Sequence, residues 1–317
     1  MTDASLFTLA GLPVTAYALG LALSLAFSSA LAARGLRKKG YAPRVVETFL
    51  LMAIPLGLLL SRLAYVLIRL NFFLDWGEGL ALRFWQGGYS FWGALAGFLL
   101  SVYLAARVNN GVNAAKLADA LAPYGLLMLA LGRWCEGLAG QGFGQLAPEG
   151  LAFFPLAVVN EYEEWRFAIF LLEGAAALVF MLMVVRRRGA PGERLRLAVI
   201  LVCAGQILFE SLRADEVLSW GFVKASQLLG AAGLMMVMAD GLFIRRRNAW
   251  RAPAHLALAA YFLIIFVIVG LEFAIDKTTI NINLIYLTMA ACCLGLAALA
   301  LRASTDRIHP ATKEETP

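Results

Sequence analysis

The chain has 317 residues, of which 61% are hydrophobic and only 15% are charged, and its mean hydropathy is +0.76. A water-soluble globular protein of this length does not need so much apolar surface, so the composition excludes the soluble classes and predicts a polytopic membrane protein. The 27 lysines and arginines outnumber the 21 acids. They gather in the loops between apolar segments, which argues against a nucleic-acid partner.

Nine apolar segments follow one another along the chain. Each meets or approaches the roughly 20 residues that a helix needs to cross the hydrocarbon layer. They cover residues 12–33, 46–68, 89–106, 117–135, 167–185, 196–212, 224–243, 254–274 and 283–301. The sequence therefore predicts an all-α polytopic membrane protein with nine spans, of which the third and sixth are short.

Basic residues indicate the orientation of these spans. If the N-terminus is outside, 19 of the 27 lysines and arginines fall on the inner side and 8 in the outer half. The inner group lies at residues 34–44, 107–116, 186–196, 245–251 and 302–313. Because cytoplasmic loops are enriched in lysine and arginine, we expect the N-terminus outside and the C-terminus inside.

Two segments of the outer side are too long to be simple turns. Residues 69–88 mix aromatic and charged side chains, as an arm at the membrane interface would, and residues 137–166 are rich in glycine and acidic residues. The inner loops are short and basic. Since irregular backbone at a membrane surface commonly carries function, we expect the functional site on the outer face.

Residues that bind metals are scarce and scattered. The cysteines, Cys135, Cys203, Cys292 and Cys293, lie in or at the ends of apolar segments without metal-ligand spacing. We therefore expect no metal and no cofactor. The only histidines, His255 and His309, fall on the inner side of this topology. A histidine base on the outer face is thereby excluded.

Charged side chains inside spans are costly and are functional candidates by default. In the outer half they are Arg62, Arg133, Glu136, Glu173, Glu210 and Arg213. Arg133 and Glu136, at i and i+3, share one helical face. Gln206, Glu210 and Arg213, at i, i+4 and i+7, share another.

Structural roles for some of these residues stay open. Arg62 and Arg213 lie near the outer boundary and could extend to lipid head groups, and Glu210 with Arg213 could be a neutralising packing pair. Arg133 is harder to explain in this way. It lies 14 residues beyond Asp119, or roughly 21 Å along a helix. This spacing places Arg133 in the outer third of the bilayer.

Glycines follow Arg133 closely in "GLAGQGFG", residues 137–144. Glycine lets the backbone leave helical geometry and approach a ligand. Exposed N–H groups beside an arginine would form an anion site. A flexible exit from the membrane is the alternative interpretation.

Six stretches in the first seven spans resemble, in the right order, the bacterial prolipoprotein diacylglyceryl transferases. They are "VTAYALGLAL", "LSRLAYVL", "WQGGYSFWGALAG", "DALAPYGLLMLALGRWCEGLAGQGFG", "LLEG" at 171–174, and "FESLRADE" with "SQLLG". The resemblance implies a seven-span transferase-like domain at residues 1–245. Residues 246–317 would form a C-terminal extension with two further spans and a cytoplasmic tail.

The resemblance also implies a reaction at the outer face of the bacterial plasma membrane. The diacylglyceryl group of phosphatidylglycerol passes to the lipobox cysteine of a preprolipoprotein, a thioether forms, and glycerol phosphate leaves. Arg133 and Arg213 would bind the lipid phosphate, and Glu136 or Glu210 would accept the thiol proton. The further lipid contacts implied are Tyr17, Arg62, Gly140, Gln141, Gly144 and Gln206.

Several positions depart from the family's pattern. Trp92 stands where the motif has a histidine, Glu136 where it has an asparagine, and Gln206 where it has an arginine. A lipid-binding paralogue or scaffold without transferase activity therefore stays open as an alternative. A transporter is a third class. Apart from Asp119, few polar residues occupy the inner halves of the spans, which disfavours a continuous path.

Overall fold

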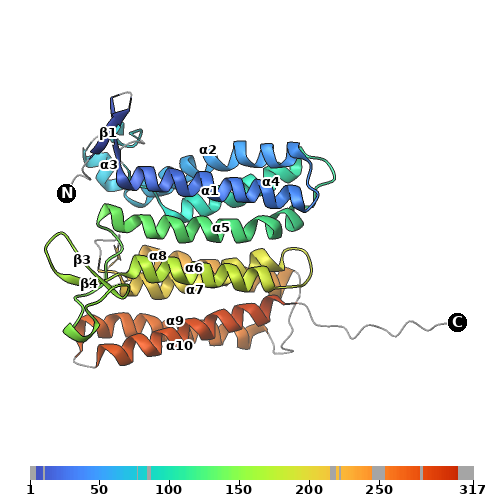
Figure 1. Cartoon of the computed structure of the whole chain (residues 1–317). Helices are drawn as coiled ribbons and strands as arrows, with labels where there is room; N and C mark the ends of the chain where they lie inside the picture. The colour runs from blue at the N-terminus through green and yellow to red at the C-terminus, as the bar shows by residue number, and fades with distance from the viewer. Residues whose placement is uncertain are drawn as a thin grey trace. The chain divides into compact units, whose positions relative to one another are not determined.

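The computed structural model describes most of the chain (Figure 1). The described residues are 5–9, 11–76, 78–83, 87–214, 219–220, 223–244, 254–278 and 281–305. Within them, nine helices are long and apolar enough to cross a membrane. The only sheets in the same ranges are three two-stranded antiparallel hairpins. The predicted class, an all-α polytopic membrane protein, is confirmed.

The long helices occupy the predicted apolar segments. They are α1 Ala16–Lys38, α2 Pro43–Ile68, α4 Phe91–Val108, α5 Ala114–Glu136, α6 Ile169–Arg186, α7 Glu193–Leu212, α8 Ala225–Ala239, α9 Ala254–Lys277 and α10 Ile282–Ser304. A π-helical turn, η5 Asp240–Ile244, continues α8. The first span was predicted to start at residue 12. It starts later because Leu12–Thr15 is a strand paired with Ser5–Leu9.

Shorter elements fill the segments between spans. They are the strands β1 Ser5–Leu9, β2 Leu12–Thr15, β3 Ala157–Val159, β4 Trp165–Phe167, β5 Ser219–Trp220 and β6 Val223–Lys224, with α3 Leu70–Trp76 and the 3-10 turns η1 Glu78–Leu80, η3 Gly137–Ala139 and η4 Glu149–Leu151. The arm predicted at residues 69–88 thus contains α3 and η1. The segment predicted at 137–166 contains two 3-10 turns and most of the β3–β4 hairpin.

Local signals in the sequence explain where several helices begin. The Thr15 hydroxyl accepts a hydrogen bond from the Ala18 amide at the start of α1, and the Asn113 side chain accepts one from the Lys116 amide at the start of α5. Such caps satisfy amide groups that have no partner inside the helix. The Asp119 carboxylate accepts hydrogen bonds from the Gly192 and Leu195 amides at the start of α7. Asp119 is therefore a capping residue.

The chain divides into two compact units. The first unit comprises residues 1–198 and 212–218, and the second comprises residues 199–211 and 219–317. In the first unit α1, α2, α4, α5 and α6 pack side by side, and the β1–β2 hairpin, α3 and the β3–β4 hairpin lie at the same end of these helices (Figure 1). In the second unit α8, α9 and α10 pack together. The predicted domain boundary at 245/246 lies outside the described residues, as does His309.

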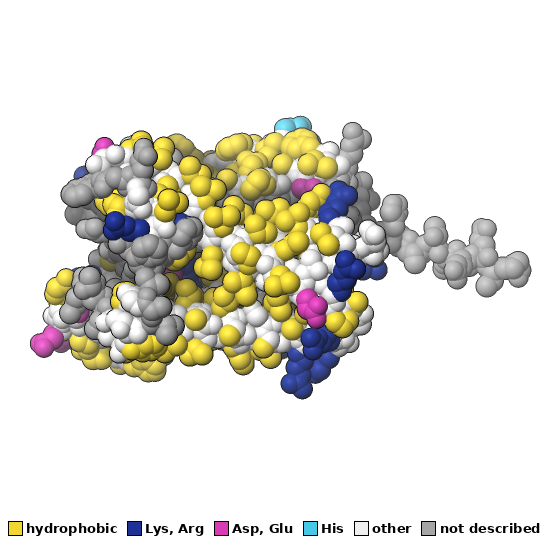
Figure 2. Space-filling view, turned by 90° about the horizontal axis from the view of Figure 1, so that it is seen from above, with side chains coloured by type: hydrophobic (Ala, Val, Ile, Leu, Met, Phe, Trp, Pro, Cys, Tyr) yellow, Lys and Arg dark blue, Asp and Glu magenta, His cyan; other side chains and the backbone are white. Residues whose placement is uncertain are grey.

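Small residues allow the closest helix contacts of the first unit. A Cβ added at Gly97 on α4 would lie 2.6 Å from the Leu56 carbonyl oxygen on α2, so only glycine permits this approach. Exposed side chains on the helices are largely apolar. On the face drawn in Figure 2, hydrophobic side chains form a broad band, and most of the visible lysines and arginines gather at one end of it. This distribution is typical of a surface in contact with lipid.

Candidate active site: a buried charge cluster beside a glycine loop

Four charged side chains of the first unit meet at the end of α5. We call Arg133, Glu136, Glu173 and Arg213 the charge cluster. Arg133 donates a hydrogen bond to Glu136 Oε1, and its Nε lies 2.9 Å from Glu173 Oε1. Arg213 Nη1 lies 2.9 Å from Glu136 Oε2 and 3.6 Å from Glu173 Oε2. Each guanidinium therefore contacts both carboxylates.

The charge cluster is electrically balanced and shielded from solvent. The exposed fraction of its side chains ranges from 4% for Glu173 to 14% for Glu136. With both glutamates ionised, two positive charges face two negative charges. Buried ion pairs are stable only when their geometry and hydrogen bonds offset the free-energy cost of removing the charges from water. An anionic ligand that binds these guanidiniums would compete with the two carboxylates for them.

Close packing of α5 against α6 positions Arg133 relative to Glu173. The Trp134 indole donates a hydrogen bond of 3.2 Å to the Leu171 carbonyl. A Cβ at Gly174 would collide with that indole and lie 2.9 Å from the Ala130 carbonyl oxygen. Glu173 and Gly174 are adjacent, so the contact that needs glycine also brings the Glu173 carboxylate to Arg133.

The glycine loop, residues 137–144, passes beside the charge cluster. Gly140 and Gly142 adopt left-handed backbone conformations, with φ of 66° and 78°, which glycine reaches without strain. A Cβ at Gly142 would lie 3.3 Å from Glu136 Oε2, so the loop backbone passes beside this carboxylate. The predicted departure from helical geometry therefore occurs at the charge cluster.

Backbone hydrogen bonds hold the glycine loop in place. The Phe170 amide donates to the Gly142 carbonyl at 2.9 Å. The Ala214 amide donates to the Phe143 carbonyl at 2.8 Å, and Gly144 forms a β-bridge with Arg213. The loop thus fixes the segment that carries Arg213. Because α7 ends at Leu212, Arg213 follows the path of this bridge and not the helical face expected from the sequence.

Other predicted residues lie at varying places relative to the charge cluster. Tyr17, in the first turn of α1, has Glu136, Arg133 and Arg213 among its electrostatic neighbours. Gln141 belongs to the glycine loop, where its backbone amide donates a hydrogen bond of 3.0 Å to the Glu136 backbone carbonyl. Glu173 was expected only as a charged residue of the outer half. Its direct contact with Arg133 could not be seen from sequence spacing.

Arg62 binds backbone and does not extend to the surface. Its guanidinium donates hydrogen bonds to the carbonyls of Leu80, Ala81, Gly87 and Gly88, and its exposed fraction is 5%. The guanidinium also lies 5.8 Å from the Tyr65 ring centroid. Arg62 therefore holds the arm at residues 69–88, and the head-group interpretation of this residue is wrong.

Gln206 and Glu210 belong to the second unit. Both are buried, with exposed fractions of 3% and 5%. The Lys224 ammonium donates a hydrogen bond of 2.6 Å to the Glu210 backbone carbonyl. The ion pairs of Arg213 described above are with Glu136 and Glu173.

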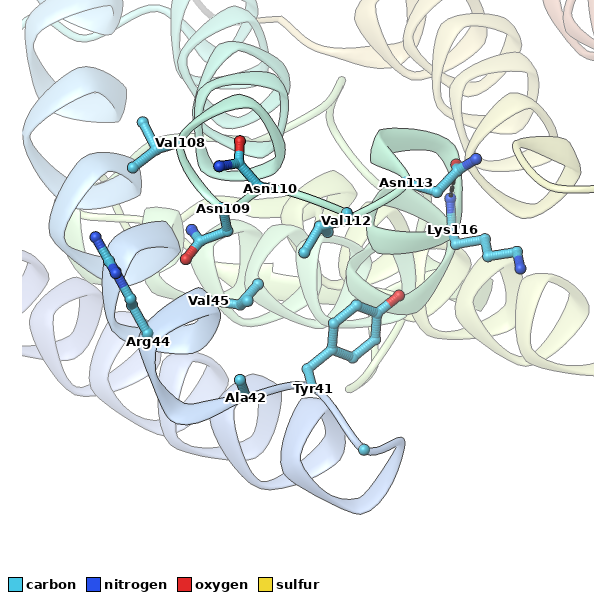
Figure 3. Close-up of a pocket in the computed structure, with 12 residues that line it drawn as sticks. Tyr41, Ala42, Arg44, Val45, Val108, Asn109, Asn110, Val112, Asn113 and Lys116 are labelled. Carbon is cyan, nitrogen blue, oxygen red and sulfur yellow. Dashed lines mark hydrogen bonds between the residues drawn. The ribbon is translucent and has the colours of Figure 1, made fainter.

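A polar pocket lies at the opposite end of α5 from the charge cluster. Its volume is about 630 Å³, and residues of the α1–α2 and α4–α5 turns line it (Figure 3). Arg44 and Lys116 lie on different sides of it, with Asn110 between them at the rim (Figure 3). No carboxylate is among the lining residues. The pocket therefore offers positive charge but no carboxylate to accept a proton.

Comparison with known proteins identifies the family to which the chain belongs. The sequence pattern of the prolipoprotein diacylglyceryl transferases matches residues 4–245, a range that contains all four residues of the charge cluster. The chain belongs to the prolipoprotein diacylglyceryl transferase family. The family match ends before α9 and α10, which form a C-terminal extension to the matched region.

Curated relatives carry the same name. A phosphatidylglycerol–prolipoprotein diacylglyceryl transferase of Listeria innocua is 28% identical over 253 residues, which cover 77% of this chain and 87% of the relative. One from Frankia alni is 31% identical over 222 residues, covering 65% and 57% respectively. One from Paenarthrobacter aurescens is 26% identical over 276 residues, covering 78% and 83%.

Trp92 is the residue for which the resemblance to the family motif leads us to expect a histidine. Its ring packs edge-on against Phe91, with 5.4 Å between ring centroids, and the Arg133 guanidinium lies 5.6 Å from the Phe91 centroid. The Trp92 indole nitrogen is buried and has no hydrogen-bond partner in the part of the chain that the structure describes. An indole N–H can only donate, so Trp92 cannot replace a histidine base.

Proposed function

We propose that this protein transfers the diacylglyceryl group of phosphatidylglycerol to the lipobox cysteine of a preprolipoprotein. The observation that carries the proposal is the buried charge cluster within the segment that matches the family. Two guanidiniums, two carboxylates and a glycine loop supply the groups that this reaction needs: phosphate binding, a proton acceptor, and a backbone that can approach the ligand.

The two arginines form the phosphate site of the proposal. A guanidinium is always charged, and its planar donors match phosphate oxygens in pairs. Arg133 and Arg213 both contact Glu136. A lipid phosphate bound between the two guanidiniums replaces these contacts. The negative charge that develops as glycerol phosphate leaves is then stabilised where it forms.

Glu136 is the proton acceptor of the proposal. Once the phosphate occupies the two guanidiniums, the Glu136 carboxylate faces the incoming thiol and takes its proton. The sulfur forms a bond to the terminal glycerol carbon of the diacylglyceryl group, and the bond from that carbon to the phosphate oxygen breaks. The departing oxygen keeps the bonding electron pair, and glycerol phosphate leaves as an anion.

The proposed orientation places the charge cluster on the outer face of the bacterial plasma membrane. Arg34, Arg37 and Lys38 lie near the end of α1, and Arg44 is the second residue of α2. These residues belong to the end of the helices opposite Arg133. Reporter fusions at residue 150 should be active outside the cell, and fusions to the C-terminus inside it. The reverse pattern would contradict the orientation.

A reconstituted transfer assay tests the function. The purified protein is placed in vesicles of phosphatidylglycerol or phosphatidylcholine with a lipobox peptide, and mass spectrometry follows the peptide. We expect a diacylglyceryl thioether only with phosphatidylglycerol. The matched control is a peptide with serine at the lipobox cysteine, which should stay unmodified.

The same assay separates the enzyme from a protein that only binds lipid. If vesicles containing phosphatidylglycerol give no product while the protein still binds this lipid, transfer is refuted and the lipid-binding paralogue is favoured. If phosphatidylglycerol is neither bound nor used, the phosphate role of the charge cluster is refuted as well.

A further inference from the structure

The C-terminal extension brings an acidic residue into the second unit. Glu272 lies on α9, beyond the end of the family match at residue 245. Its exposed fraction is 7%, in a span with a mean hydropathy of 2.6. A carboxyl group in such a helix is costly, and its usual reason is a specific polar partner. Glu272 should therefore contact a specific polar group.

One such partner is Gln227, in the first turn of α8. The Gln227 side-chain amide donates hydrogen bonds to Glu272 Oε1 and, at 3.3 Å, to the Ile207 carbonyl of α7. Its oxygen accepts a hydrogen bond of 3.0 Å from the Lys224 amide. Gln227 is 5% exposed. Glu272, the Ile207 carbonyl and the Lys224 backbone amide together fix which way the Gln227 side-chain amide points, because only its NH₂ group can donate.

These contacts fasten the start of α8 to the end of α7. Gln227 holds the Ile207 carbonyl, and the Lys224 ammonium holds the Glu210 carbonyl at 2.6 Å. Both carbonyls lie near the end of α7, and Glu210 is among its last four residues, whose carbonyls have no partner inside the helix. The end of α7 carries Glu210 and leads along the chain to Arg213.

We propose that Glu272 is a positioning residue for the transfer reaction. Through Gln227 it holds the end of α7, and so it sets the backbone from which the Glu210 side chain extends. This inference rests on the proposed function, since it concerns the rate of that reaction.

The positioning role predicts how two substitutions of Glu272 change the stability and the transfer rate. Removing one partner of a buried hydrogen bond leaves the other unsatisfied and costs stability, whereas replacing both partners by apolar groups can be nearly neutral. Glu272→Leu should therefore lower the apparent melting temperature and, assayed well below it, lower the transfer rate by about tenfold or more. Glu272→Gln keeps an oxygen that can accept from Gln227, so it should retain most of the parent's rate.

The pairing with Gln227 supplies the second part of the test. In a Gln227→Leu background, adding Glu272→Leu should cost no further rate, because the group through which Glu272 acts is already gone. The matched control is Tyr261→Phe. It removes another hydrogen bond from α9 to α8, that of the Tyr261 hydroxyl to the Ala231 carbonyl at 2.6 Å. Tyr261→Phe should leave the transfer rate unchanged.

Hydrogen–deuterium exchange of residues 205–211 gives a readout that does not depend on turnover. Glu272→Leu should raise exchange there, whereas Glu272→Gln and Tyr261→Phe should not. Unchanged exchange in Glu272→Leu overturns the proposal even if the parent proves inactive. Raised exchange with an undiminished transfer rate also overturns it. If the parent shows no transfer activity but Glu272→Leu raises the exchange, the proposed function is refuted. The hold of Glu272 on the end of α7 through Gln227 is then still supported.

Discussion

Removing the Arg133 guanidinium should expose the mutual dependence of the charge cluster. In Arg133→Met the apolar stem of the side chain stays, but Glu136 and Glu173 then share the single guanidinium of Arg213. That guanidinium lies 2.9 Å from Glu136 and 3.6 Å from Glu173. Breaking a buried ion pair costs about 3–5 kcal/mol. Because Arg213 still serves both acids, we expect a loss near the lower value, about 3 kcal/mol.

A second substitution should return much of this loss. Arg133→Met with Glu173→Gln leaves one carboxylate facing one guanidinium, so no charge remains uncompensated. We expect the double variant to be more stable than Arg133→Met alone by about 2 kcal/mol, within the range measured for coupled neighbours. For a chain of this size 1 kcal/mol corresponds to roughly 2 °C. The single variant should then melt about 6 °C below the parent and the double variant about 2 °C below it.

Thermal unfolding in one detergent at one scan rate measures these differences, because membrane proteins commonly unfold irreversibly. The matched control is Arg107→Met on α4. The Arg107 side chain is exposed and bonds only to Tyr103 in the described part of the chain, so its loss should cost below about 1 kcal/mol. The single variant Glu173→Gln completes the comparison. If adding Glu173→Gln to Arg133→Met lowers the melting temperature as much as Glu173→Gln lowers it in the parent, the two residues act independently and the reasoning is refuted.

Three further predictions follow from contacts outside this pair. Arg62→Lys should increase protease cleavage within residues 69–88, because an ammonium cannot reach four carbonyls; unchanged cleavage would contradict the clamp. Gly174→Ala should lower the melting temperature through its collision at the α5–α6 contact, whereas Gly270→Ala, which meets open space, should not. The Arg166 side chain holds the pKa of Glu164 below its usual range, so NMR titration of Arg166→Gln should find that pKa raised; an unmoved value would exclude the contact.

The sequence predicted the spans and part of the charge cluster for separate physical reasons. Apolar segments of spanning length must become helices in lipid, because no other structure satisfies their backbone. The i, i+3 spacing of Arg133 and Glu136 predicted a shared face, and their ion pair confirms it. Both inferences use only local geometry, which the order of residues determines.

What the sequence could not predict depends on contacts between distant segments. Glu173 reaches Arg133 because α5 and α6 pack closely at Gly174. Arg213 leaves the helical face of Glu210 because α7 ends one residue earlier and a β-bridge with Gly144 begins. The folding of the arm at residues 69–88 around Arg62 is similarly a long-range event. None of these contacts has a signal in sequence spacing.

The rate of peptide conversion by the parent and by Glu136→Gln, measured side by side, tests the central claim most directly. The glutamine keeps the size and hydrogen bonding of the side chain but cannot take a proton. We predict that the parent converts the lipobox peptide in phosphatidylglycerol vesicles, and that Glu136→Gln binds the lipid as well as the parent yet forms no thioether. Equal rates for the two proteins would contradict Glu136 as the proton acceptor, and no conversion by the parent would contradict the transferase itself.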